Sequence, residues 1–320
     1  MVAVVIVPVL ILVGFAPGLL GERETSDADV VSITARGLQF EAPREIPQGW
    51  TTFQFENKSG MTHFAMIERL PEGVGVEAHQ RDVAPIFQKG FELMAAGQAD
   101  AASNTFDQLP AWFQDVVFLG GPGLVGPGRT TQATVNLDPG TYLIECYVKS
   151  NGLFHSYNPL PTKYGMVHEF TVTEETSGGS EPEPSVTLEI SKAEGIVRSS
   201  DEPIPPGSHT VAVRFRDQAV YENFVGHDVH LARLASEEDE ARLDAWMDWT
   251  AADGLETPAP VTFLGGTNDM PGGTTGYFTV DLTEGRYAWV AEVPNPSAKG
   301  MLKPFTVPAE ETVTTRDGNE

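Results

Sequence analysis

The sequence contains only one cysteine, Cys146, in 320 residues. A single cysteine excludes a disulfide within the chain, so this thiol is buried and inert, paired with another chain, or bound to a metal ion. Positive charge is also scarce: Lys and Arg number 20 against 45 Asp and Glu, which gives a formal net charge of -25. Such a surface repels phosphate backbones and anionic lipid headgroups. We therefore expect no nucleic-acid partner, but a cationic protein or a metal ion, although acidity can also serve only solubility or adaptation to salt.

The motifs of several enzyme classes are missing as well. The glycine-rich segment 118–128 has neither the lysine of a phosphate-binding loop nor a helical pattern after it, so it predicts turns. The chain shows no serine-nucleophile motif, no zinc-protease helix and no cluster of paired cysteines. We therefore expect that the protein alone is not an enzyme.

The chain begins with an apolar run. Residues 2–20 carry no charge and are just long enough to span a membrane, which is typical of an export signal or a single membrane anchor. However, no Lys or Arg precedes the run, and Pro8 and Pro17 would disturb a helix. Residues 21–29 indicate a polar tether. We expect an exported protein, periplasmic or extracellular, and leave open whether residues 2–20 are cleaved or form a membrane tether.

The remainder of the chain contains the same series of landmarks twice, in residues 46–172 and 204–307. Six landmarks in one order are hard to obtain by chance, so we predict two copies of one domain. Cys146 in the first copy aligns with Ala291 in the second, so only one copy carries a thiol. Further aligned pairs are Ile46-Pro47 with Ile204-Pro205, His63 with His227, Phe118-Leu119-Gly120-Gly121 with Phe263-Leu264-Gly265-Gly266, and Gly165-Met166 with Gly300-Met301.

This duplication predicts the domain organisation. After the leader and tether at 1–29, we expect domain 1 at 30–173 and domain 2 at 186–308. Residues 174–185, rich in Glu, Ser, Gly and Pro, are predicted to link them. The charged tail at 309–320 has no apolar period and is predicted to be disordered.

Both copies show the pattern of short strands separated by Gly and Pro. Residues 141–149 predict a strand that is buried on its cysteine face and wetter on the other. The cysteine face holds Tyr142, Ile144, Cys146 and Val148, and the wetter face holds Leu143, Glu145, Tyr147 and Lys149. The corresponding strand of the second copy keeps this phase and places Glu292 outward.

Each copy also carries a helical insert after its first histidine. Val83, Phe87, Phe91 and Met94 form one apolar stripe, and Pro85 limits where that helix can begin. In the second copy, Ser236 and Asp239 resemble a capping box. We interpret both inserts as covers packed on a sandwich, so the predicted fold class is all-β, with two Greek-key β-sandwiches that each have a short helical insertion.

Three segments of the first copy bear a family resemblance: Phe55-Glu56-Asn57-Lys58-Ser59-Gly60-Met61-Thr62-His63, Asp138-Pro139-Gly140-Thr141-Tyr142-Leu143-Ile144-Glu145-Cys146, and Tyr164-Gly165-Met166-Val167. They resemble the cupredoxins, the plastocyanin- and azurin-like blue-copper proteins. In that family a turn delivers the first copper histidine, a strand carries the copper thiolate, and a Gly-Met pair supplies a weak axial ligand. The resemblance spans most of each repeat and implies two tandem cupredoxin-like domains, the second a degenerate copy.

The resemblance also implies a copper site in domain 1. A blue-copper centre needs one thiolate and two imidazoles in a near-trigonal arrangement, with a long thioether contact. His63, Cys146, His155 and Met166 occur in the cupredoxin order, so Cys146 would be the thiolate donor, the histidines the imidazole donors and Met166 the axial contact. The implied function is single-electron transfer or copper carriage outside the cytoplasm, with a cationic redox protein as partner.

The spacing departs from that of plastocyanin-like proteins. His155 lies nine positions after Cys146 and Met166 eleven after His155, so we expect a long loop that holds the ligands less rigidly. His168 competes with His155 as the second imidazole, although strand alternation disfavours it. Cys146 can equally be a small buried core residue, and His63 can be a histidine hydrogen-bonded to the backbone. Met166 is better explained as a core residue, because Met301 occupies the same place where no thiolate exists.

In the second copy, His227 and His230 lie close in sequence, but Ala291 replaces the thiol. A type 1 copper site cannot form there, and we predict that domain 2 is metal-free and serves as a structural or docking partner. The chain also lacks the His-x-His pairs of oxidases built from cupredoxin domains.

The alternative function is a metal-free β-sandwich adhesion or scaffold protein, or an accessory protein of an exported complex. The sequence does not define the oligomeric state.

Overall fold

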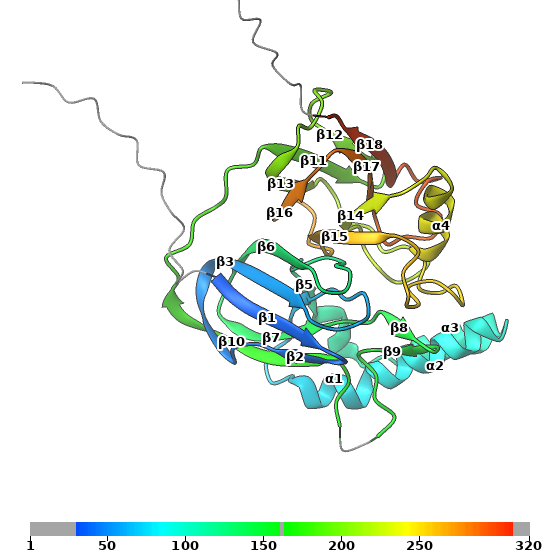
Figure 1. The fold of residues 1–320 in the computed structure, drawn as a ribbon. Helices are drawn as coiled ribbons and strands as arrows, with labels where there is room; N and C mark the ends of the chain where they lie inside the picture. Colours follow the sequence, from blue (N-terminus) through cyan, green and yellow to red (C-terminus); the bar gives the residue numbers. More distant parts are fainter. Residues whose placement is uncertain (1–29, 161–162, 310–320) are drawn as a thin grey trace, which may run out of the picture.

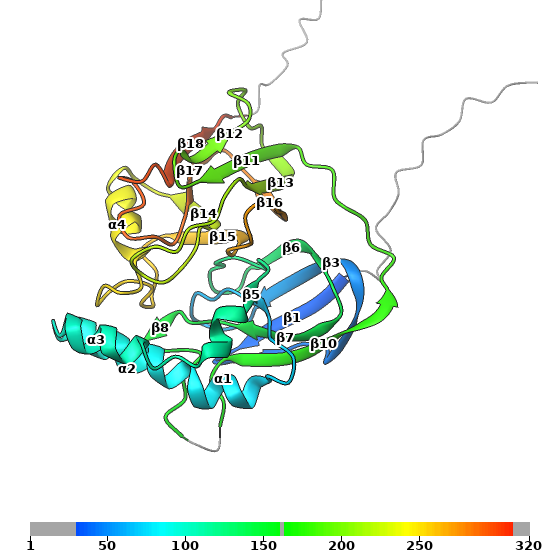
Figure 2. The same cartoon turned by 180° about the vertical axis from the view of Figure 1, so that it is seen from behind.

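The computed structural model describes residues 30–160 and 163–309. These residues form two lobes, which lie one above the other in Figure 1 and, turned around, in Figure 2. The predicted leader and tether at 1–29 and nearly all of the predicted tail lie outside the described residues. None of the helices in the described part of the chain has the length and apolarity needed to cross a membrane.

The first lobe is a sandwich of two sheets. One sheet has the order β2-β1-β3-β6, with β1 at Val30–Arg36, β2 at Gln39–Glu41, β3 at Glu45–Asn57 and β6 at Thr130–Leu137. The other has the order β10-β7-β4-β5, with β4 at Met66–Arg69, β5 at Val117–Phe118, β7 at Gly140–Glu145 and β10 at Val167–Thr176. Aromatic contacts such as Phe53 with Phe170 join the two sheets across the core.

One long strand belongs to both sheets of this lobe. The first residues of β3 pair with β10, and the residues from Gly49 onward pair with β6. Gly49 has φ +109°, a conformation that side chains rarely adopt, so glycine lets the strand pass from one sheet to the other.

The second lobe has the same strand order. Its sheets are β12-β11-β13-β16 and β18-β17-β14-β15, with β11 at Val186–Ser191, β12 at Gly195–Arg198, β13 at Gly207–Phe215, β14 at Val229–Leu234, β15 at Thr262–Thr267, β16 at Thr275–Leu282, β17 at Gly285–Val290 and β18 at Leu302–Val307. The predicted fold class is therefore confirmed as far as the architecture goes: an all-β protein with two β-sandwiches, each with a helical insertion. The lobes also share hydrogen bonds, because β16 pairs with β6 through Tyr277–Thr279 and makes one sheet continuous across both.

The helices are inserted between strands, as predicted. In the first lobe, α1 (Val76–Asp82), α2 (Ala84–Ala95), α3 (Ala99–Phe106) and a short 3-10 helix (Ala111–Asp115) lie between β4 and β5. The predicted stripe packs inward, with Val83 and Phe91 buried. Phe106 of α3 also contacts Phe224 and Trp249 of the second lobe, so the insert bridges the two lobes.

The single helix of the second lobe, α4 (Glu238–Trp246), lies between β14 and β15. Its predicted capping box is only half formed. The Asp239 carboxylate accepts hydrogen bonds from the backbone of Ala235 (2.6 Å) and Ser236 (3.0 Å), whereas no side chain caps the helix N-terminus.

The prediction of a wetter face on residues 141–149 is wrong. Leu143 and Lys149 are buried as completely as Cys146, and Glu145 (8% exposed) and Glu292 of the second lobe (1%) are buried too. Only Tyr147 of this face is partly exposed. The helical insert covers Leu143 and, through His79, Glu145, whereas the second lobe contacts Tyr147 and Lys149. Alternation identified the two faces of the strand correctly, but it could not show that a second layer lies on the outer one.

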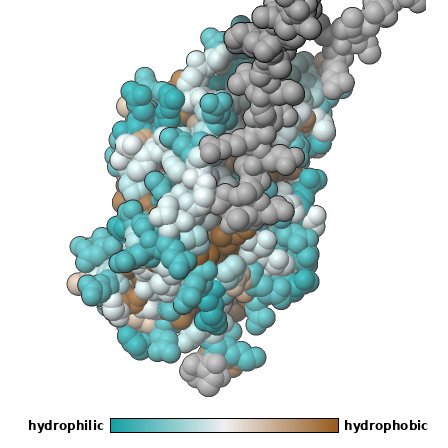
Figure 3. Space-filling model, turned by 90° about the vertical axis from the view of Figure 1, so that its left-hand side faces the viewer, coloured by the Kyte–Doolittle hydropathy of each residue, from teal (hydrophilic) through white to brown (hydrophobic). Residues whose placement is uncertain are grey.

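The surface of the described residues is largely polar on the side seen in Figure 3. Hydrophobic areas on this side are small.

Candidate metal centre

The turn that carries His63 is fixed by a side chain at the end of β3. The Asn57 amide donates hydrogen bonds to the carbonyls of Met61 (2.7 Å) and Val125 (3.0 Å), and its Oδ1 accepts the Ser59 N–H (3.0 Å). Such side-chain bonds let Asn stabilise a turn without regular secondary structure. His63 then exchanges two backbone hydrogen bonds with Val125, of 3.2 and 2.8 Å. The ring is thereby held at one end of the sandwich.

Cys146 follows β7 directly and is completely buried. Its N–H donates to the Met166 carbonyl (3.2 Å), and the Met166 N–H donates to the His155 carbonyl (2.6 Å). The three residues predicted to bind copper on this side of the site are thus tied together through their backbones.

His155 is delivered by a tight hairpin. Strands β8 (Lys149–Ser150) and β9 (Leu153–Phe154) pair across Asn151 and Gly152, whose φ angles are 53° and 72°. Positive φ at both central residues is typical of the two-residue turn that Asn-Gly favours. The His155 N–H also donates to the Val148 carbonyl (2.8 Å). The path from Cys146 to His155 is therefore a hydrogen-bonded hairpin, whereas the looser hold expected of the longer loop as far as Met166 stays a prediction.

The second lobe clamps this hairpin. The Glu256 carboxylate accepts the N–H groups of Asn151 (2.5 Å) and Gly152 (3.1 Å) at the turn. The backbone of Lys149 bonds to Leu255 (2.7 Å) and Thr257 (2.9 Å) on either side of Glu256. A ligand of the first lobe is consequently held in place by residues more than a hundred positions away in the sequence.

Three potential metal donors converge in the core. Cys146 Sγ lies 3.5 Å from His63 Nδ1 and 3.7 Å from His155 Nδ1, and the two nitrogens are 3.1 Å apart. Ligand bonds of about 2.0 Å for nitrogen and about 2.3 Å for sulfur, set at 120°, would place donors roughly 3.5–3.8 Å apart. The observed triangle is close to that spacing, so one ion at its centre could contact all three donors with little rearrangement.

Burial sets the protonation of these groups. It lowers the pKa of His63 to about 4. Burial, together with repulsion from His63, lowers the pKa of His155 to about 3. Both imidazoles are therefore neutral at pH 7, which is the form that binds metals. Burial also raises the pKa of the Cys146 thiol to about 12, so an incoming ion must displace its proton.

The two remaining candidates lie in different surroundings. Met166 is fully buried, and its backbone contacts both Cys146 and His155. His168 lies on β10, and its Nε2 is 3.0 Å from the Pro43 carbonyl. The structure brings His155, and not His168, next to Cys146.

Sequence reasoning missed the residues behind His155. Ser150 Oγ lies 2.8 Å from His155 Nε2, 2.8 Å from Thr257 Oγ1 and 3.2 Å from Met61 Sδ. A partner on the distal ring nitrogen fixes the orientation of a metal-binding imidazole. The Asn151-Gly152 pair is a sequence signal for the hairpin. No sequence pattern indicates that Thr257 contacts Ser150.

The second lobe repeats the backbone hydrogen bond that joins Cys146 to Met166, but it has no thiol at that position. The Ala291 N–H donates to the Met301 carbonyl (3.0 Å), as Cys146 does to Met166. His227 Nδ1 lies 3.0 Å from the Tyr221 hydroxyl and Nε2 lies 2.8 Å from Asp217, so both ring nitrogens have protein partners. This part of the lobe serves packing and hydrogen bonding.

Several solved copper proteins show a weak likeness to the chain. Auracyanin from the photosynthetic bacterium Roseiflexus castenholzii is 22% identical over 45% of this chain and 97% of its own, with a TM-score of 0.25. A multicopper oxidase is 12% identical over 87% of this chain and 87% of its own, with a TM-score of 0.21. The copper-containing nitrite reductase of Thermus scotoductus is 11% identical over 88% of this chain and 61% of its own, with a TM-score of 0.21. These scores are too low to carry an inference about this chain. No protein-family model and no curated protein matches it.

Proposed function

We propose that the protein is an exported cupredoxin-like protein that binds one copper ion in its first lobe and transfers single electrons. The observation that carries the proposal is the buried triangle of Cys146, His63 and His155. One thiolate with two imidazoles is the donor set that suits both Cu(I) and Cu(II). Copper bound there would supply one-electron redox chemistry, and Met166 is proposed as the axial contact.

The surroundings favour electron transfer over copper carriage. Both histidines are at most 1% exposed, and the hairpin that carries His155 is clamped by the second lobe. An ion could enter or leave only if this clamp opened. A rigid site holds its ligands through a change of oxidation state, whereas a carrier must release its metal. The proposed ion is therefore retained.

The second lobe is proposed to be a copy of the first that has become a structural partner. The equal strand order of the two lobes and the matching hydrogen bonds of Cys146 and Ala291 support this proposal. We place the boundaries at the predicted domains 30–173 and 186–308. The acidic surface suits a cationic redox partner, whose association would weaken as salt increases. The proposal that the protein is exported depends on the uncharged apolar run at residues 2–20.

Copper titration tests the proposal. We expect one equivalent of Cu(II) to give the intense visible thiolate-to-copper band, and Cys146→Ser to abolish it. His155→Ala should remove or strongly alter the band, whereas the matched control His168→Ala should leave it unchanged. Absence of colour at stoichiometric copper would favour the metal-free scaffold. Colour that survives His155→Ala but not His168→Ala would overturn the ligand assignment.

A further inference from the structure

A second group of potential metal ligands lies behind the first site, on the outer face of the same sheet. Glu68 comes from β4, Glu145 from β7 and His79 from α1, and each is at least nine-tenths buried. Glu145 precedes Cys146 directly, so alternation along the strand places the two side chains on opposite faces.

The donor atoms of this second group have the spacing of a metal site. One atom each of Glu68, His79 and Glu145 lies within 4.8 Å of the other two. His79 Nε2 is 3.4 Å from Glu145 Oε2. Nitrogen and oxygen ligands about 2.0–2.2 Å from a tetrahedral ion lie roughly 3.3–3.6 Å from each other. The observed distance matches this ligand separation and is longer than a usual N–H···O hydrogen bond.

One of these donors lacks a partner. Glu68 Oε1 is buried without a hydrogen bond to any of the described residues. Burial and repulsion from Glu145 raise the pKa of Glu68, so without a cation the side chain is a neutral acid whose Oε1 has no partner among the described residues. Leaving such a polar atom unpaired away from water costs free energy, and native proteins rarely do so without a reason. A cation bound between the two carboxylates would satisfy this oxygen.

The group also borders a cavity. A space of about 100 Å³ is lined by all three side chains and by Asp269, Tyr147 and Ser156, with aromatic walls supplied partly by the second lobe. A single water needs only about 10–15 Å³ by this kind of measure, so the space holds an ion together with the waters that complete its coordination. Three protein ligands and an open position are an arrangement found at zinc sites.

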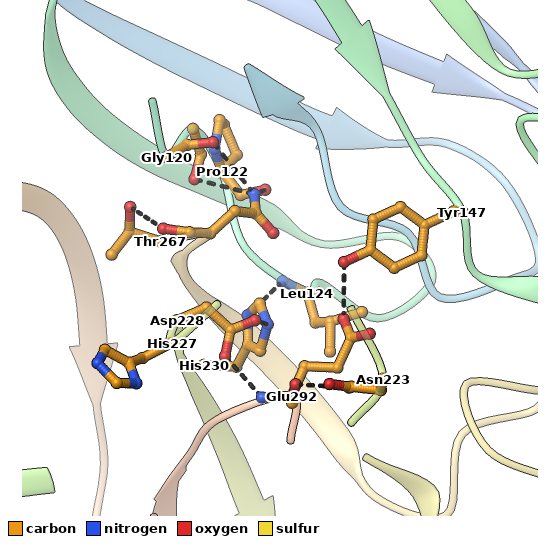
Figure 4. Close-up of polar contacts among 12 residues, drawn as sticks. Gly120, Pro122, Leu124, Tyr147, Asn223, His227, Asp228, His230, Thr267 and Glu292 are labelled. Carbon is orange, nitrogen blue, oxygen red and sulfur yellow. Dashed lines mark hydrogen bonds and ion pairs between the residues drawn. The ribbon is translucent and has the colours of Figure 1, made fainter. Parts of the chain in front are cut away.

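A neighbouring acidic group also has a buried carboxylate oxygen, Glu292 Oε1, without a hydrogen bond from the described part of the chain, but it differs in the state of its imidazole. Figure 4 shows Asp228, His230 and Glu292 of the second lobe beside Leu124 and Tyr147 of the first. His230 Nδ1 accepts the Leu124 N–H (3.1 Å), and Nε2 lies 2.7 Å from Asp228. Both ring nitrogens are therefore occupied by protein groups, and we interpret this cluster as a polar contact between the lobes.

We propose that Glu68, Glu145 and His79 bind a divalent transition-metal ion, separately from the thiolate site. Two carboxylates and one imidazole, without sulfur, suit borderline and hard ions such as Zn²⁺, Co²⁺ or Mn²⁺ and disfavour Cu(I). The bound ion joins β4, β7 and α1 and fixes the helical insert against the sheet. The site does not depend on copper binding, because no donor is shared.

Cobalt titration of the full chain tests this proposal. Because the thiolate site can itself bind Co²⁺, the titration is made in the Cys146→Ser chain, where we expect one Co²⁺ to bind with visible d–d bands and no thiolate-to-cobalt band. Glu68→Gln and His79→Gln should each weaken it by roughly 10–100-fold, since even outer-shell changes reach that size. The matched control Glu292→Gln changes an equally buried carboxylate of the neighbouring cluster and should leave Co²⁺ affinity unaltered.

Three outcomes would overturn the proposal: affinity unchanged in both Glu68→Gln and His79→Gln, binding lost in Cys146→Ser, or no Co²⁺ bound by the folded wild-type chain. Circular dichroism establishes whether each variant is folded. If both variants unfold, crystals of the wild-type protein soaked in Zn²⁺ decide the question. An anomalous peak among Glu68, His79 and Glu145 supports the site, and its absence there contradicts it.

Discussion

The Thr257 hydroxyl of the second lobe lies 2.8 Å from the Ser150 hydroxyl of the first. Ser150 in turn lies 2.8 Å from the distal nitrogen of His155. This chain of hydroxyl groups connects a lobe that has no thiol to the proposed copper ligand of the other lobe. It gives the second lobe a specific task, namely the orientation of one imidazole.

Replacement of Thr257 by valine should loosen that imidazole. Valine keeps the shape of the side chain but removes the hydroxyl. Apart from His155, the Ser150 hydroxyl contacts only Thr257 and Met61 among the described residues, so the variant leaves it with Met61 alone. Loss of such an outer partner lowers metal affinity by roughly 10–100-fold. Competition with a copper chelator measures the affinity, and the visible spectrum should shift with it. Thr187→Val, on β11, serves as the control, and equal effects of both variants would contradict the positioning role.

Replacement of Gly165 by alanine should disrupt the site from the other side. A Cβ atom at Gly165 would lie 2.0 Å from the Ser156 carbonyl oxygen, directly after His155. The backbone would have to move, so we expect a loss of roughly 2 kcal/mol or more in the free energy of unfolding, together with weaker copper binding. Chemical denaturation measures the free energy of unfolding, and copper titration measures the binding.

Gly60→Ala is the matched control, because a Cβ atom there has no neighbour within 4 Å. The control should change the free energy of unfolding by less than about 1 kcal/mol. A Gly165→Ala protein as stable as this control would show that the close approach to Ser156 is not needed.

Lys149 should make stability depend on alkaline pH. Its fully buried ammonium group donates to the carbonyls of Trp249 (2.7 Å) and Ala251 (2.9 Å) and lies 3.7 Å from the centre of the Phe91 ring. Burial lowers the pKa of Lys149 from 10.5 to about 8. The folded state thus holds fewer protons at Lys149 than the unfolded state between these values, so the contribution of Lys149 to the free energy of unfolding should rise as pH increases from about 8 to 10.5. The raised pKa values of Cys146 and the buried tyrosines act in the opposite direction, so the rise is the difference between the wild type and a variant that lacks Lys149.

The size of this effect is at most about 3 kcal/mol, since each pKa unit corresponds to about 1.4 kcal/mol. Urea denaturation of the wild type and of Lys149→Met across this range measures it. The variant should lack the rise, although it is less stable at every pH because two carbonyls lose their donor. Parallel curves for the two proteins would show that Lys149 is not responsible.

Introduction of a thiol into the second lobe should not create a second blue site. Ala291→Cys places sulfur at the position equivalent to Cys146, but the ring of His227 is engaged by Tyr221 and Asp217. Residues 292–301 contain no histidine that could replace His155. The variant should therefore show the same intensity of the visible band per chain as the wild type. A doubled band would mean that the lobes differ only in the cysteine.

The local features of the fold could be predicted because they depend on neighbouring residues. Alternation identified the strand that leads to Cys146, and the apolar stripe from Val83 to Met94 identified a packed helix. The order of His63, Cys146 and His155 was sufficient to suggest a shared site, and the structure places these three side chains together. The hairpin between Cys146 and His155 was not predicted, although Asn151-Gly152 is a turn signal within it.

The sequence by itself indicated the strand that leads to Cys146, one helix in each insert and the donors of the thiolate site, because side-chain period and residue type express local conformation and chemistry. Only the tertiary structure decided that Glu145 and Glu292 are buried, that Thr257 supports His155, and that Glu68 lies beside His79. These relationships arise where a second layer covers a strand face that is polar in sequence. No period within a strand records which distant segment will cover it, so contacts between the lobes become visible only when the chain is folded.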